Sequence, residues 1–218
     1  MSDVHVQLLD LACGAFLLTG VLILWRSELA KIVTLFALQG VALAALIAVL
    51  GAHEGSAELA AVAVGIGALR AGVLPYLLRR ALAASGERRE TKPIVNVASS
   101  LVAAAVLALL AYAVCQPVIR LAPTPATQAV PVAMTVIFLG FFVLATRRRA
   151  LSQVVGFLLI DNGITAMAFL TAGGLSPVVE IGVSLDVLLA VLVLQVLTTR
   201  MRAAFGGTDL DELRELRD

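Results

Sequence analysis

Long apolar runs recur along this 218-residue chain and are separated by short polar segments. A run of about 20 residues in a helix, which rises 1.5 Å per residue, spans the ~30 Å hydrocarbon layer of a bilayer. The runs are continuously apolar and do not alternate, which favours helices over barrel strands. The pattern predicts seven transmembrane helices, at about 8–25, 31–51, 58–78, 94–116, 129–146, 151–172 and 178–198.

Composition agrees with an all-α integral membrane protein. Hydrophobic residues make up 61% of the chain and charged residues 14%, with a mean hydropathy of +1.02. The net charge of +1 gives no reason to expect nucleic acid as a partner. No Lys or Arg precedes the first apolar run, so we interpret that run as a retained helix and not as a signal peptide.

The basic residues are unevenly distributed among the predicted loops. If seven helices alternate in direction, fourteen of the sixteen Lys and Arg residues fall on one side, in segments 26–31, 79–93, 147–149 and 200–217. The predicted opposite loops, 52–57, 117–128 and 173–177, contain only Arg120. The positive-inside rule therefore predicts an external N-terminus and a cytoplasmic C-terminus.

Four predicted helices carry a polar residue near mid-depth: Gln39, Arg70, Asp161 and Asp186. Asp161, followed by Asn162, lies ten residues beyond the start of its apolar run, or roughly 15 Å deep. A carboxylate at that depth costs roughly 2.5–3.5 kcal/mol on insertion scales, and such residues commonly mark ion pathways. These positions are the candidate functional site.

The number of buried acids relative to buried cations suggests what the site does. Arg70 cannot lose its proton, so it is a fixed positive charge that calls for a carboxylate partner. Asp161 and Asp186 are the two candidates, and one arginine neutralises only one of them. The other acid would then lie unpaired where burial disfavours its charged form, which suits proton exchange.

The remaining polar residues keep two interpretations each. Arg70 is either a structural counter-ion or part of the pathway. Gln39 either forms a hydrogen bond that holds two helices together or hydrates and orients the groups of the pathway. Glu180 lies two residues into its predicted helix, where it is either an anchor at the membrane interface or the entrance of a path.

Cys13 and Cys115 fall inside apolar runs and are expected to be buried hydrophobic residues. We predict no metal site, cofactor site or catalytic site in this chain.

The chain also contains an internal repeat. A shift of 122 residues aligns RSELAKIVTLFALQG (26–40) with RRALSQVVGFLLIDN (148–162) and places Gln39 on Asp161. We predict two parallel three-helix units at 1–80 and 129–200. Between them we expect a cytoplasmic linker, a linker helix and an outer loop within 81–128, and after them a cytoplasmic tail at 201–218.

Three segments together resemble a known family. RRRALSQVVGFLLIDNG (147–163), VVEIGVSLDVLLAVLVLQVL (178–197) and DLDELRELRD (209–218) are similar to hydrogenase-4 component E (HyfE-type proteins). The second half also resembles the K subunit of complex I (NuoK) and the C subunit of Mrp antiporters, whose two membrane acids match Asp161 and Asp186. Asp161 is displaced by about one helical turn from the NuoK pattern, and Arg70 stands where component E would have a lysine.

The resemblance implies a non-catalytic membrane subunit that sits beside antiporter-like subunits in the cytoplasmic membrane of a bacterium or archaeon. It implies that redox energy is coupled to H⁺ or Na⁺ transfer through Asp161, Asp186, Gln39, Arg70, Glu180 and Asn162. Ni–Fe and iron–sulfur centres would belong to partner subunits. Two alternatives stay open: a subunit of an Mrp-type cation/proton antiporter, and a purely structural membrane scaffold.

Overall fold

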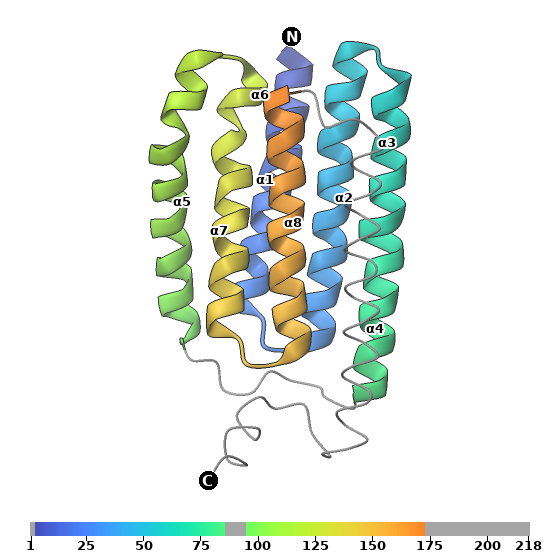
Figure 1. Ribbon diagram of the computed structural model, residues 1–218, viewed down its shortest axis with the longest axis vertical. Helices are drawn as coiled ribbons and strands as arrows, with labels where there is room; N and C mark the ends of the chain where they lie inside the picture. The colour runs from blue at the N-terminus through green and yellow to red at the C-terminus, as the bar shows by residue number, and fades with distance from the viewer. Residues whose placement is uncertain (1–2, 86–94, 173–218) are drawn as a thin grey trace.

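The computed structural model of the protein describes residues 3–85 and 95–172, which form a bundle of long helices running along one axis (Figure 1). The elements in chain order are α1 (Asp3–Trp25), α2 (Leu29–Glu54), α3 (Ala57–Gly67), the π-helical turn η1 (Ala68–Val73), α4 (Leu74–Ser85), α5 (Val97–Leu121), α6 (Pro125–Gln128), α7 (Val130–Thr146) and α8 (Ala150–Ala172).

Six helices in the described part are long and apolar enough to cross a membrane. One of these spans is composite, because α3, η1 and α4 run without a break from Ala57 to Ala83. The predicted all-helical, multi-pass membrane architecture is therefore confirmed. The predicted seventh helix at 178–198 lies outside the described residues, so the number seven and the pairing into NuoK-like units stay predictions.

The expected outer loop over 117–128 is wrong in part. α5 continues through Pro117 to Leu121, and a short helix, α6, follows at Pro125–Gln128. A proline removes only one N–H from the helical ladder, and an apolar environment favours keeping the other backbone hydrogen bonds inside the helix. Thr124 then caps α6, because its side chain accepts a hydrogen bond from the backbone N–H of Thr127.

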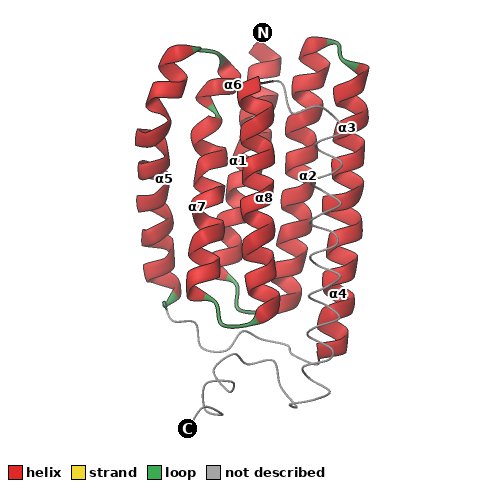
Figure 2. Ribbon diagram, viewed as in Figure 1, coloured by secondary structure: helices red, strands yellow, loops and turns green. Residues whose placement is uncertain are grey.

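Helix α2 lies at the centre of the packing, in contact with α1, α3, η1, α4 and α8. α7 packs against α8, α5 and α1, and α5 lies at the margin of the bundle (Figure 1). The turn between α1 and α2 and the turn between α7 and α8 lie at the same end of the bundle (Figure 2). Arg26 and the three arginines 147–149 therefore share one side, while the side that faces the cytoplasm stays a prediction.

Arg147 joins these two turns. Its side chain is buried, and its Nη2 donates hydrogen bonds to the carbonyl oxygens of Leu24 at 2.8 Å and Arg26 at 3.3 Å. The last carbonyl groups of a helix have no partner within the helix, and a basic side chain can satisfy them. The α7–α8 turn thus caps the end of α1.

Glycines allow α7 and α8 to approach closely. A Cβ atom added at Gly140 would lie 2.7 Å from the carbonyl oxygen of Gly156, and one added at Gly163 would lie 3.0 Å from that of Ala133. Small residues are the usual means by which membrane helices pack at short distance. The described part of the second predicted unit is this tight hairpin; the predicted divisions at residues 80, 128 and 200 stay predictions.

Candidate functional site

Arg70 is the largest fully buried side chain in the described part of the chain, with 1% of its side chain exposed. It lies in η1, where the N–H of Leu74 bonds to the carbonyl of Leu69, five residues back, instead of four. Pro75 follows directly and has no N–H to add to the ladder. Local π-helical turns are a known way for membrane helices to accommodate proline, and they are frequent at functional sites.

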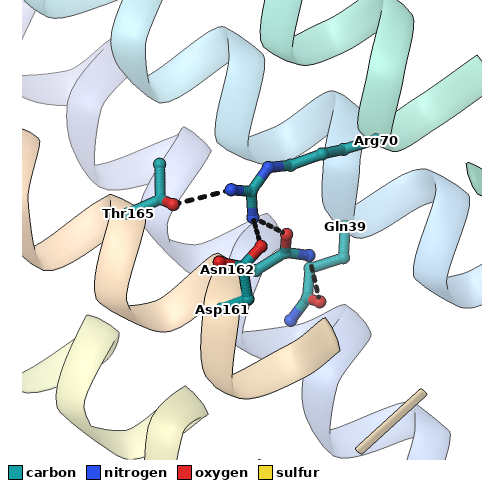
Figure 3. A network of polar contacts seen from close by, with 5 residues as sticks. All are labelled: Gln39, Arg70, Asp161, Asn162 and Thr165. Carbon is teal, nitrogen blue, oxygen red and sulfur yellow. Dashed lines mark hydrogen bonds and ion pairs between the residues drawn. The ribbon is translucent and has the colours of Figure 1, made fainter. Parts of the chain in front are cut away.

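The guanidinium of Arg70 is paired with Asp161. Arg70 Nη1 lies 2.7 Å from Asp161 Oδ2 and also donates to Asn162 Oδ1 (Figure 3). Arg70 Nη2 donates to Thr165 Oγ1 at 2.8 Å. Three side chains of α8 therefore surround one guanidinium, and the positive charge of η1 is balanced by the negative charge of α8.

Two amides extend this contact across the bundle. Asn162 Nδ2 donates to Gln39 Oε1 at 3.0 Å, and Gln39 Nε2 donates to the carbonyl oxygen of Phe16 at 3.4 Å. The hydrogen bonds run in one direction, from Arg70 through Asn162 to Gln39 (Figure 3). From Gln39 they continue to the backbone of α1. The network thus connects α1, α2, η1 and α8.

Glycines make room for the network. A Cβ atom added at Gly40 would lie 2.7 Å from the carbonyl carbon of Arg70 and 2.8 Å from its oxygen, so α2 and η1 touch at this point. A Cβ atom added at Gly20 would lie 3.2 Å from Gln39 Nε2. A backbone can approach another backbone or a buried amide this closely only where no side chain intervenes.

The structure brings together four of the predicted site residues: Gln39, Arg70, Asp161 and Asn162. Asp186 and Glu180, the other two, lie outside the described residues. Of the two acids that could neutralise Arg70, Asp161 is therefore seen to do so.

Sequence reasoning missed two members of the network, Thr165 and the carbonyl of Phe16. Thr165 had a detectable signal, because it lies four residues after Asp161 and so on the same side of α8. The Phe16 carbonyl had no such signal, because every residue has a backbone carbonyl and the residue type does not show which one accepts a hydrogen bond.

Within the network, the chemistry of proton exchange is restricted to one group. Amides of Asn and Gln do not titrate in the physiological range, and arginine stays protonated. Asp161 is thus the one titratable carboxyl group among the five side chains shown in Figure 3. Among residues 3–85 and 95–172, no group of three or more His, Cys, Asp or Glu side chains is placed to hold a metal ion, and Cys13 and Cys115 are both buried and free.

Comparison with known proteins gives one full-length relative and a more distant group. The chain is 50% identical over 220 aligned residues to the uncharacterized protein Rv0085 of Mycobacterium tuberculosis, and the alignment covers 100% of both proteins. It is 30% identical over 126 residues to hydrogenase-4 component E of Escherichia coli K12 and of Shigella flexneri, which covers 58% of this chain and 58% of theirs.

No protein-family model and no solved structure matches the chain. The full-length identity to Rv0085 shows the family of this chain, and the partial match adds a more distant similarity to hydrogenase-4 component E. The chain therefore belongs to the same family of multi-pass membrane proteins as Rv0085 of Mycobacterium tuberculosis.

Proposed function

We propose that this chain is a non-catalytic membrane subunit of a complex-I-like respiratory hydrogenase, or of a related ion-translocating complex, and that Asp161 exchanges protons near the middle of the membrane. One observation carries the proposal: a carboxylate on α8 faces a buried guanidinium on a π-helical turn, in the interior of an apolar bundle. The similarity to hydrogenase-4 component E supports the type of complex.

Each residue has a separate role in this proposal. Asp161 gains and loses the proton, and Arg70 provides the constant positive charge that makes an ionised Asp161 tolerable in the membrane. In this proposal Asp186 is the second acid of the proton path, and Glu180 is the residue at the entrance of that path. Protons are the proposed ion, with Na⁺ as the alternative cation.

The partners follow from the same proposal. Antiporter-like membrane subunits would lie beside this chain, and Ni–Fe and iron–sulfur centres would belong to a peripheral arm made of other subunits. In an Mrp-type antiporter the membrane partners would be similar, but no redox arm would be present. The metal content of the purified assembly separates these two complexes.

A specific observation favours a second candidate, a structural scaffold. The Asp161 charge is already balanced by Arg70, and the network ties α1, α2, η1 and α8 together. A buried ion pair that only holds helices in register would have the same geometry. The two functions predict different assembly and pumping when Arg70 and Asp161 are replaced together.

The test uses the tagged chain purified with its partners in mild detergent, and inside-out vesicles from the same cells. We compare Asp161→Asn with the double variant Arg70→Gln/Asp161→Asn, which removes both charges and so leaves no uncompensated cation. Asp10→Asn, at an exposed position of α1, is the control.

For a proton-exchanging Asp161, the double variant assembles in normal yield but pumps several-fold fewer protons per electron. For a scaffold, the single variant loses assembly, and the double variant recovers both assembly and pumping. Normal coupled pumping in an assembled Asp161→Asn complex would remove Asp161 from the pathway.

A further inference from the structure

The two sides of α8 differ sharply in exposure around Asp161. Asn162 and Thr165 are buried, as are Leu158 and Phe169 on the same side of the helix. Phe157, four residues before Asp161, is 49% exposed, and Ile164, three residues after it, is 52% exposed. Residues three and four apart share a helix face, so Asp161 lies at the border between the buried and the open side of α8.

Exposure within the ion pair is also unequal. The Asp161 side chain is 11% exposed, while the Arg70 side chain is 1% exposed. Gln39, Asn162 and Thr165 are all more deeply buried than Asp161. Of the five network side chains, the carboxyl group is thus the one that reaches the surface of the described bundle.

Among the described residues, the hydrogen-bonded chain of Arg70, Asn162 and Gln39 contains no titratable group that could pass a proton on from Asp161. Arg70 is a permanent cation, and Asn162 and Gln39 are amides that neither release nor take up protons under ordinary conditions. Their chain of hydrogen bonds ends on the backbone carbonyl of Phe16. An ion pathway that runs through the amides toward α1 would therefore stop there.

We infer that protons exchange with Asp161 across the open face of α8, between Phe157 and Ile164, and that Gln39 and Asn162 are positioning residues for Arg70 and not proton carriers. This inference rests on the proposed function, because it takes Asp161 as the proton-exchanging group. It changes the roles expected for Gln39 and Asn162: they orient the guanidinium, and the proton donor or acceptor lies outside the described bundle, on the Phe157–Ile164 side.

Labelling with a carbodiimide tests the side of access without any measurement of pumping. Dicyclohexylcarbodiimide dissolves in the membrane and adds to protonated carboxyl groups, and mass spectrometry of the full chain locates the adduct. We expect wild-type membranes to be labelled at Asp161, with more labelling as the pH is lowered, because the reagent requires the protonated acid. Asp161→Asn must abolish the adduct.

Matched variants then identify the face. Ile164→Trp and Phe157→Trp should each reduce labelling at Asp161 several-fold by covering the open edge, whereas Phe141→Trp, on an exposed position of α7, should leave it unchanged. Gln39→Met should keep Asp161 labelled, since the amide is not on the route. All three tryptophan variants alter exposed positions and are expected to fold.

The inference would be overturned by the absence of an adduct at Asp161 at every pH, or by an adduct that is unaffected by Ile164→Trp and Phe157→Trp. Labelling that disappears in a correctly folded Gln39→Met protein would do the same. The proposed function could still fail with the labelling as expected, if the double variant of Arg70 and Asp161 pumps normally.

Discussion

Arg70 of η1 and Asp161 of α8 form a salt bridge with 2.7 Å between Nη1 and Oδ2, and Asp161 is flanked in sequence by Asn162, which accepts a bond from the same nitrogen. Burial of either charge alone would be costly in an apolar bundle. The pair is thus the energetic centre of the polar network, and its two members should be far more sensitive to single than to joint replacement.

Arg70→Gln should destabilise the bundle by about 3–5 kcal/mol, because it leaves the Asp161 carboxylate buried without its cation. The measurement is thermal or denaturant unfolding of the detergent-solubilised full chain. Arg79→Gln, at an exposed arginine of α4, is the matched control and should have little effect. The double replacement Arg70→Met/Asp161→Leu should recover most of the loss; equal damage in single and double variants would contradict the charge argument.

Gly40→Ala should weaken the contact between α2 and η1. The added Cβ would meet the backbone of Arg70 at less than 3 Å, and backbone atoms cannot move aside as a flexible side chain can. Overpacking of this kind typically costs about 1–3 kcal/mol. Gly65→Ala, in α3 and with nothing within 4 Å of the added Cβ, is the control. Similar melting temperatures for the two variants would show that α2 and η1 are not in close contact.

Arg147→Gln should loosen the end of the bundle where the two turns meet. It removes hydrogen bonds from a charged group to the carbonyls of Leu24 and Arg26, and bonds of this type contribute about 1.5–3 kcal/mol. Faster amide hydrogen exchange in the last turn of α1 is the expected signal. Arg148→Gln changes a neighbouring exposed arginine and should leave that turn protected.

The orientation of the chain can be tested with two exposed positions at opposite ends of the bundle. In a background with Cys13→Ala and Cys115→Ala, Glu54→Cys should react with a membrane-impermeant maleimide added to intact cells. Arg148→Cys should react only after the membrane is opened, because the positive-inside rule places the arginine turns in the cytoplasm. The reverse pattern would show that the bundle sits in the membrane the other way round.

Much of the site follows from physical rules applied to the sequence. A buried arginine requires a carboxylate, so a partner for Arg70 could be predicted, and only two acids were available. The choice of Asp161 could not be made, because depth along a helix does not tell which way a side chain points around it. Asn162 and Gln39 were recognised as polar groups near mid-depth, but their hydrogen bond to each other needed the packing of α8 on α2.

The π-helical turn was not predicted, although its signals were present. The apolar run around Arg70 predicts one regular helix over 58–78, whereas Pro75 and Gly72 within it are residues that disfavour a regular helix. Pro117 shows the opposite case, because it also lies inside a helix, yet α5 carries no π-helical turn. A proline alone therefore does not determine the local helix geometry, which also depends on the buried contacts with the neighbouring helix.

The π-helical turn at Arg70 also keeps the two halves of its span in phase. Each four-residue step on a regular helix advances about 40° around the axis, so a series of such steps would soon rotate the side chains away from α2. The turn takes up one residue, or about 100°, and returns the lower half to the same azimuth. The buried side chains of this span form one row: Leu59, Ala63, Ile66, Arg70, Leu74 and Leu78. Deleting Gly72 would therefore restore the regular α-helical hydrogen bonds and leave this row on one side of the span. Inserting a residue there would rotate the part of the row after Arg70 away from α2.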